Sequence, residues 1–452
     1  MKKILVIGAG RSAIVLIDYL LENAEVENWH ITVADADAAH AKKMIGDSKS
    51  ATAIELDATI DARRAALIAD HDLIISMLPA FLHTMVANDC LALKKNLVTP
   101  SYISEDMRKM SQVVKDAGLI FLNELGVDPG IDHMSAMRLL DDMRSKGKEI
   151  TCFESFTGGL VAPESDDNPW NYKFTWNPRN VVLAGQGGAV KFKHNGKFKY
   201  IPYQKLFRRT EVIKIPDYGL FEGYANRDSL SYRELYKLED IPTIYRGTLR
   251  RKGFCRSWDV FVQLGMTDDT YIMEDSMNMT HREFTNSFLK YNEHDSVELK
   301  LQYYMKMDQD GDVFDKLQWL GIFDNELIGL DKPSTPAQIL QKILEKKWSL
   351  KPGDKDMIVM WHKIRTRDNA DSPEEEIHSS MVVIGDEEPR TAMAKTVGLP
   401  MAIAAKLILN GTITTPGVHA PVTKEIYEPI LNELESFGIS FEEREMPLSI
   451  ND

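Results

Sequence analysis

Short apolar runs alternate with helical patterns along the first 130 residues of the chain. Residues 4–7 form an apolar strand, and a turn that contains Gly8 and Gly10 follows it. Apolar residues then recur at helical spacing from Val15 to Leu20. This order of strand, turn and helix is typical of the opening of a βαβ unit.

Further apolar runs extend the pattern. Strands are predicted at residues 31–34, 73–76, 96–99 and 119–122, and helices around residues 81–93 and 104–117. Short buried strands separated by helices are typical of a parallel sheet that is covered on both faces. The sequence therefore predicts an α/β fold with a Rossmann-type, doubly wound parallel sheet.

The turn after the first strand contains the residue types that bind a dinucleotide. Gly8 permits a tight turn, Gly10 lets the backbone approach a pyrophosphate, and Ala13 keeps the helix close to the sheet. The amides at the helix start would face the diphosphate, and Asp35 would accept hydrogen bonds from a ribose. The alternative is an ordinary βα turn with an incidental acid. The predicted cofactor contacts are Gly8, Gly10, Arg11, Ser12, Ala13, Asp35, Ser76 and Pro79.

The pattern changes after residue 150. Residues 190–193 and 197–200 alternate between apolar and polar side chains, and they flank a turn at Asn195 and Gly196, which predicts a β-hairpin. From about residue 223 to 350 the pattern is mostly helical and charged. Strands are predicted again at residues 357–361 and 381–384, and a long apolar helix at residues 392–409, with Gly411 just beyond its end.

Polar residues follow the predicted strands at 96–99 and 119–122. The segment 123–133 contains Glu124 and Asp128, and side chains of this kind on a shaped turn can bind an ammonium group or move a proton. The alternative is that an acid of this segment only caps the next helix. Tyr102 contacts either substrate or core, and His83 is expected to be a satisfied surface histidine.

Composition narrows the class of protein. The chain has 452 residues, which predicts two or three domains, and a net charge of −14, which disfavours nucleic acid as a partner. No apolar run approaches membrane-spanning length, and the first strand begins at once, so we expect neither a membrane anchor nor a signal peptide. Three isolated cysteines indicate no disulfide framework and no metal site, and they fit a cytoplasmic location.

Several motifs together resemble one family, the glutamate-forming saccharopine dehydrogenases, also called saccharopine reductases. The resemblance extends over essentially the whole chain. It rests on the glycine turn at residues 8–10 and on TPSYIS (99–104), ELGVDPGIDH (124–133), GGLVAPE (158–164), NPWNYKFTW (168–176), NRDS (226–229), RGTL (246–249) and GVHAP (417–421).

The resemblance implies a domain organisation in which the chain end returns to the first domain. We expect a Rossmann domain at residues 1–130 that is completed by residues 392–452. We expect a mixed α+β substrate domain at residues 131–222 and 351–391, with a mainly helical insertion at residues 223–350. A homodimer is expected from the family alone.

The resemblance also implies a reaction. Saccharopine would be oxidised at its secondary amine by hydride transfer to NAD or NADP, and the imine would be hydrolysed to L-glutamate and 2-aminoadipate 6-semialdehyde. Asp128 is the expected acid/base, with Tyr102 orienting substrate or water and Glu124 in the same segment. The expected substrate contacts are Ser101, Thr157, Gly158, Arg227 and Arg246, while Arg250 and Arg251 are further candidate carboxylate clamps.

Two positions depart from the family pattern. The family often has cysteine where this chain has Thr157, so a thiol role is not expected here. Many relatives carry a cation just after the second strand, whereas this chain has Asp35 and Asp37, which would repel a 2′-phosphate. We therefore expect NAD to be preferred over NADP.

Two other functions remain open at this point. One is a carboxynorspermidine dehydrogenase-like condensation of a diamine with aspartate semialdehyde, which would need an acidic pocket and fewer arginine clamps. The other is a redox sensor that binds NAD without turnover, which would need no proton shuttle.

Overall fold

The computed structural model describes residues 1–226, 228–308 and 311–448 of the chain. The chain divides into two compact units. The first unit contains Met1–Ile150, Thr366–Glu375 and Met381–Arg444, and the second contains Thr151–Arg365, Glu376–Ser380 and Glu445–Asp452.

A seven-stranded parallel sheet forms the centre of the first unit. Its strands are β1 (Lys2–Ile7), β2 (Trp29–Asp35), β3 (Ala51–Glu55), β4 (Leu73–Ser76), β5 (Asn96–Val98), β6 (Ile120–Leu122) and β15 (Gly417–His419). They lie in the order β15-β6-β5-β4-β1-β2-β3. The chain reverses its direction of winding between β1 and β4, which is the point where doubly wound sheets bind ligands. The predicted Rossmann-type sheet is confirmed.

The first unit also contains helices. They are α1 (Ala13–Asn23), α2 (Ala38–Ile45), α3 (Asp61–Ala69), α4 (His83–Ala92), α5 (Glu105–Lys109), α6 (Ser111–Asp116), α7 (Ile131–Ser145), α15 (Ala392–Leu409) and α16 (Lys424–Glu435). A buried cluster that includes Leu5, Ile74 and Phe121 forms part of the core beneath them. Strand β3 was not predicted, because it lies at the sheet edge and is only half-buried.

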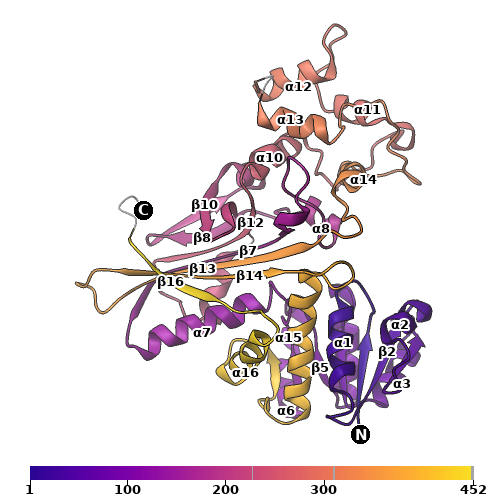
Figure 1. Cartoon of the computed structure of the whole chain (residues 1–452), viewed down its shortest axis with the longest axis vertical. Helices are drawn as coiled ribbons and strands as arrows, with labels where there is room; N and C mark the ends of the chain where they lie inside the picture. Colours follow the sequence, from indigo (N-terminus) through magenta and orange to yellow (C-terminus); the bar gives the residue numbers. More distant parts are fainter. Residues whose placement is uncertain (227, 309–310, 449–452) are drawn as a thin grey trace. The chain divides into compact units, whose positions relative to one another are not determined.

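Helix α15 is long and apolar enough to cross a membrane by length and composition, although no apolar run was expected to approach that length. However, 72% of its apolar window is buried inside the protein. It lies beside α1 (Figure 1), and a Cβ on Gly398 of α15 would come within 2.7 Å of the backbone nitrogen of Leu16. The close approach of the two helices therefore requires glycine at this position.

Helix α7 belongs with the first unit by its contacts, although the sequence placed residues 131–150 in the substrate domain. It packs on α16, where Tyr427 Oη donates a 2.9 Å hydrogen bond to Asp141 and Arg138 lies 3.0 Å from Glu435. These partners come from the C-terminal part of the chain, so the sequence pattern of α7 alone did not indicate them.

A second, nine-stranded sheet contains the remaining strands (Figure 1). They are β7 (Glu149–Val161), β8 (Val190–His194), β9 (Lys197–Ile201), β10 (Thr210–Ile215), β11 (Gly219–Ala225), β12 (Thr243–Arg251), β13 (Asp356–Arg367), β14 (Glu375–Ile384) and β16 (Glu442–Met446). The predicted hairpin is confirmed as β8 and β9, with Asn195 and Gly196 at positive φ in its turn.

Helices α8 (Pro178–Val182), α9 (Tyr232–Leu235), α10 (Phe254–Leu264), α11 (His281–Asn286), α12 (Val297–Met305), α13 (Asp312–Trp319) and α14 (Pro336–Trp348) complete the second unit. The segment predicted as mainly helical, 223–350, therefore starts with the end of β11 and with β12. Strand β12 is buried on both faces, so it lacks the alternating pattern that identifies a strand in sequence.

Candidate active site

The turn after β1 is closely packed against the segment that follows β4. Gly8 has φ of +100°, and a Cβ there would lie 3.1 Å from the carbonyl carbon and oxygen of Met77. By contrast, a Cβ on Gly10 would meet no atom within 4 Å. Gly8 is therefore required by the fold itself, whereas Gly10 leaves open space in which a ligand can approach the backbone.

Helix α1 presents its N-terminus next to this space. It is 11 residues long, Ser12 at its N-cap makes no side-chain capping bond, and its first turn contains no acid. The first amides of a helix carry partial positive charge and bind anions when no side chain caps them. The predicted contacts Arg11, Ser12 and Ala13 thus lie where a pyrophosphate would fit.

Asp35, at the end of β2, is hydrogen-bonded to the turn that follows β1. Its Oδ2 accepts a 2.7 Å hydrogen bond from the amide of Ala9, and its Oδ1 accepts a 2.9 Å bond from the amide of Asp37. His40 Nε2 lies 2.9 Å from the carbonyl oxygen of Ala9. The half-buried carboxylate is therefore fixed beside the glycine turn, at the position where the sequence predicted a ribose contact.

A chain of polar contacts runs from β4 to the loop after β5. Ser76 Oγ lies 2.9 Å from His83 Nδ1, and His83 Nε2 lies 2.8 Å from Ser101 Oγ. His83 is only 4% exposed, and burial lowers its pKa to about 4. His83 was expected on the surface; it is instead a buried, neutral link between two predicted site residues.

Tyr102 and Asp128 meet at the carboxyl edge of the sheet. Tyr102 Oη donates a 3.0 Å hydrogen bond to Asp128 Oδ1, and both side chains are half-buried. Tyr102 follows β5 and Asp128 follows β6, and these strands end level because Val98 pairs with Leu122. Two residues that the sequence selected separately are thus brought together.

Glu124, on the loop after β6, is hydrogen-bonded to the loop after β5 and to helix α7. Its Oε1 accepts a 2.9 Å bond from the amide of Ile103, and its Oε2 accepts a 2.8 Å bond from His133 Nε2. Burial opposes ionisation of Glu124, but these bonds outweigh it and lower the pKa of the carboxyl. Both oxygens are therefore occupied by protein groups, which fits a role in positioning Tyr102 and Asp128.

Thr157 and Arg246 lie on one face of the second sheet. Thr157 on β7 pairs with Thr248 on β12, and Arg246 pairs with Ser155 two residues away, so all four side chains share a face. Arg246 is 5% exposed, and its guanidinium lies 3.8 Å from the centroid of the Tyr232 ring. The predicted contact Arg227 lies outside the described residues.

Gly158 has a structural reason to be glycine. A Cβ there would come within 2.6 Å of the carbonyl oxygen of Leu249, so a side chain would separate β7 from β12. Arg250 is 3% exposed and lies over the rings of Tyr172 and Phe254 at 5.1 and 5.4 Å. Among the residues that the structure describes, no carboxylate forms an ion pair with Arg250, which favours it as a binding group for an anionic ligand.

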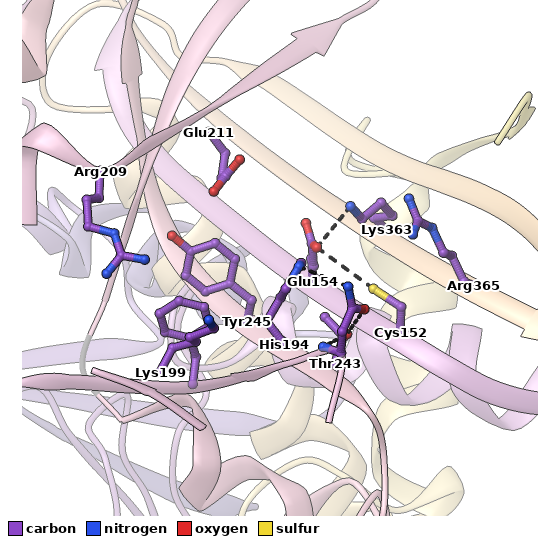
Figure 2. A pocket seen from close by; sticks show the side chains of 12 residues that line it. Cys152, Glu154, His194, Lys199, Arg209, Glu211, Thr243, Tyr245, Lys363 and Arg365 are labelled. Carbon is purple, nitrogen blue, oxygen red and sulfur yellow. Dashed lines mark hydrogen bonds and ion pairs between the residues drawn. The ribbon is translucent and has the colours of Figure 1, made fainter. Parts of the chain in front are cut away.

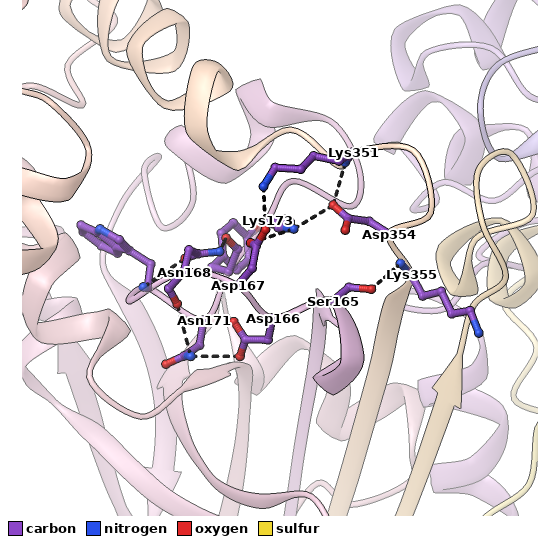
Figure 3. Close-up of polar contacts among 11 residues, drawn as sticks. Ser165, Asp166, Asp167, Asn168, Asn171, Lys173, Lys351, Asp354 and Lys355 are labelled. Carbon is purple, nitrogen blue, oxygen red and sulfur yellow. Dashed lines mark hydrogen bonds and ion pairs between the residues drawn. The ribbon is translucent and has the colours of Figure 1, made fainter.

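The motif GGLVAPE spans the end of strand β7, and the segment after it, which contains NPWNYKF, is held by a network of charges (Figure 3). Lys173 is 1% exposed and lies 2.9 Å from Asp167 and 2.7 Å from Asp354, while Lys351 bonds the other oxygen of Asp167 at 2.6 Å. The hydrogen bonds from Lys351 and Lys173 lower the pKa of Asp167 to about 2. Residues 163–173 are thereby held to the segment that precedes β13.

Known proteins resemble this chain along its whole length. A family model described as "Saccharopine dehydrogenase NADP binding domain" matches residues 4–122, and one described as "Saccharopine dehydrogenase C-terminal domain" matches residues 126–439. The saccharopine dehydrogenase [NADP(+), L-glutamate-forming] of Pyricularia oryzae is 34% identical over 98% of this chain and 99% of its own length.

Two further matches define the extent of the similarity. The mitochondrial alpha-aminoadipic semialdehyde synthase of Bos taurus is 36% identical over 97% of this chain but only 47% of its own length, so the chain spans about half of that relative. The solved structure of apo saccharopine dehydrogenase (L-Glu forming) from Saccharomyces cerevisiae matches with a TM-score of 0.89 at 32% identity, covering 99% of this chain and 100% of that one.

Proposed function

Because the chain belongs to the saccharopine dehydrogenase family, we propose that it catalyses the reversible conversion of saccharopine, NAD(P)+ and water to L-glutamate, 2-aminoadipate 6-semialdehyde and NAD(P)H. The relatives that match over their full length carry this activity in their names. The observation that carries the proposal is the hydrogen-bonded pair of Tyr102 and Asp128, which follows two strands of the same sheet as the glycine turn.

The residues of this pair have the chemistry that the reaction needs. The nicotinamide, when bound, accepts the hydride from the carbon next to the secondary amine. Asp128 accepts the proton of the amine, so that the nitrogen lone pair is available as the hydride leaves. It passes this proton to solvent and, as a carboxylate again, accepts a proton from the water that attacks the imine carbon. It gives that proton to the nitrogen of the resulting carbinolamine, so that the C–N bond breaks, the hydroxyl proton passes to the leaving amine, and glutamate and the semialdehyde are formed.

Tyr102 and Glu124 support Asp128 in this scheme. Tyr102 donates a hydrogen bond from its hydroxyl to the Asp128 carboxylate and thereby fixes the orientation of the acid. Glu124, although predicted as a catalytic candidate, bonds Ile103 and His133 with its two oxygens, so we assign it to positioning the two loops. Ser101 lies next to Tyr102 and is oriented by His83.

The carboxylates of saccharopine need cations. We propose Arg246 and Arg250, both buried on β12, as carboxylate-binding groups, with Thr157 on the neighbouring strand as a hydrogen-bond donor. Arg227 remains a predicted partner from its motif.

For the cofactor, we propose a preference of this chain for NAD. The matching family model and the full-length relatives are named for NADP, so the preference would be a property of this sequence. Its support is the carboxylate of Asp35 at the end of β2, followed by Asp37, which caps α2. Two carboxylates at this position disfavour a 2′-phosphate.

Oligomeric state and location stay proposals from the sequence: a homodimer in the cytoplasm. Mass measurement in solution and cell fractionation test them. A carboxynorspermidine dehydrogenase-like reaction remains the alternative substrate class.

Turnover by the purified protein tests the proposed function. We expect saccharopine with NAD to produce reduced nicotinamide, and glutamate to appear in equal amount. Carboxynorspermidine with NADP serves as the comparison substrate. Reduction of the cofactor with carboxynorspermidine, but not with saccharopine, would contradict the proposal.

A further inference from the structure

A polar cavity of about 240 Å³ lies within the second unit, on the side of the sheet away from Thr157 and Arg246. Cys152 and Glu154 of β7 line it, together with Thr243 and Tyr245 of β12 (Figure 2). Side chains alternate between the faces of a strand, so these residues face away from Ser155, Thr157 and Arg246. The cavity therefore lies on the face of the sheet opposite to Thr157 and Arg246.

The charged groups of the cavity are of both signs. Its lining contains four basic side chains, Lys199, Arg209, Lys363 and Arg365, and two acidic ones, Glu154 and Glu211. Two of the cations are already paired: Lys363 lies 2.9 Å from Glu154, and Arg365 lies 2.6 Å from Glu376. Within the described part of the chain, Lys199 and Arg209 form no ion pair, so their charge is available to a ligand.

The opposite side of the cavity is acidic and aromatic. Tyr245 is 4% exposed, and burial together with the charges of Glu211 and Glu154 raises the pKa of its phenol. The Phe192 ring stacks on Tyr245 at 4.4 Å between centroids. A neutral phenol beside two carboxylates, with aromatic faces next to it, is a favourable environment for an ammonium group.

The lining therefore favours a ligand that carries both charges. A simple anion would be repelled by Glu154 and Glu211, and a simple cation by Lys199 and Arg209. Most of the lining groups project from β-strands, which hold them in place before binding. From this arrangement we propose that the cavity binds a free α-amino acid, with its carboxylate at Lys199 and Arg209 and its ammonium at Glu211 and the Tyr245 phenol.

Calorimetric titration of the full chain tests this site with small zwitterions. Glycine and L-alanine are the probes, and propionate and ethylammonium are the matched single-charge controls. We expect the two amino acids to bind and the controls to bind at least about tenfold more weakly, a difference of about 1.4 kcal/mol. Equal binding of alanine and propionate would overturn the proposal.

Surface substitutions in the lining locate the site without disturbing the core. Arg209 and Glu211 are exposed, so Arg209→Met and Glu211→Gln should fold, and each should weaken alanine binding at least about tenfold. Lys197→Met, on the β8–β9 hairpin that carries Lys199 but outside the lining, should leave binding unchanged. Asp128→Asn should also leave it unchanged, which separates this site from the proposed catalytic one.

The same measurements distinguish an amino-acid site from a contact between copies of the chain. If no amino acid binds, or if alanine binding is unaffected by Arg209→Met and Glu211→Gln, the cavity is not an amino-acid site. A change of solution mass in these variants, without alanine binding to the wild type, would identify the face as a contact between copies and would overturn the proposal. Because the readout is binding, these outcomes are independent of saccharopine turnover.

Discussion

Tyr102 Oη donates a hydrogen bond to Asp128 Oδ1 across two loops that follow neighbouring strands. The loops keep this geometry because Glu124, on the loop after β6, bonds Ile103 on the loop after β5 and His133 in helix α7. The pair is therefore held by the protein before any substrate arrives.

Tyr102→Phe should lower kcat/KM for saccharopine by about 10- to 100-fold. The change removes one hydrogen bond to a carboxylate, which is worth about 1.5–3 kcal/mol, and leaves the ring in place. Steady-state kinetics measure the effect, with Tyr303→Phe as the control at an exposed tyrosine. An unchanged kcat/KM in Tyr102→Phe would remove Tyr102 from the proposed mechanism.

Asp35→Asn should raise the ratio of NADP to NAD efficiency by at least about tenfold. The amide keeps one acceptor oxygen for the turn but removes the negative charge that disfavours a 2′-phosphate. The ratio of kcat/KM values for the two cofactors measures this, with the exposed Asp70→Asn as the control. If both variants give the same ratio as the wild type, Asp35 does not select the cofactor.

Gly398→Ala and Gly10→Ala should have different effects, the first on stability and the second on cofactor affinity. The first places a Cβ 2.7 Å from a backbone nitrogen of α1, so we expect a loss of about 1–3 kcal/mol in the free energy of unfolding. The second meets no protein atom within 4 Å, so stability should be kept while cofactor affinity falls. Urea unfolding and cofactor titration of both variants test the pair, and equal stability losses would contradict this assignment.

His83 should make folding stability depend on pH in the acid range. Burial lowers its pKa from 6.5 to about 4, so the unfolded chain binds a proton in this window that the folded chain does not. The free energy of unfolding therefore falls as the pH falls from about 6.5 to about 4.

His83→Gln keeps a donor and an acceptor for Ser76 and Ser101 but does not titrate. From about pH 7 to about pH 4 it should lose about 1–3 kcal/mol less stability than the wild type. Urea titrations across this range compare the two proteins. Parallel pH dependence would mean that His83 is not a buried neutral histidine.

Elements with strong local patterns were predicted from the sequence. Strand β4 and helix α15 have the predicted bounds, 73–76 and 392–409, because their apolar runs end at clear changes of character. Strand β12 was included in a helical segment because burial on both faces removed its alternation. Strand β3 was missed because its edge position leaves it only half-buried.

Only part of the site could be predicted from the sequence. Parallel strands bring their carboxyl ends to one edge, which indicated the region of Tyr102 and Asp128, and the family resemblance selected these two residues within it. The role of His83 was not predicted, because its partners Ser76 and Ser101 converge only in three dimensions. The polar cavity was not predicted either, since its lining comes from residues 152 to 365.

The pairing of β15 with β6 has a consequence for synthesis of the protein. Strand β6 is made almost 300 residues before its partner β15, since Ile120 pairs with Gly417. Helix α15, which packs on α1, also arrives late. During translation the edge of β6 therefore stays unpaired and α1 stays uncovered until α15 and β15 have been made. In this interval the dinucleotide-binding unit is exposed to chaperones and proteases.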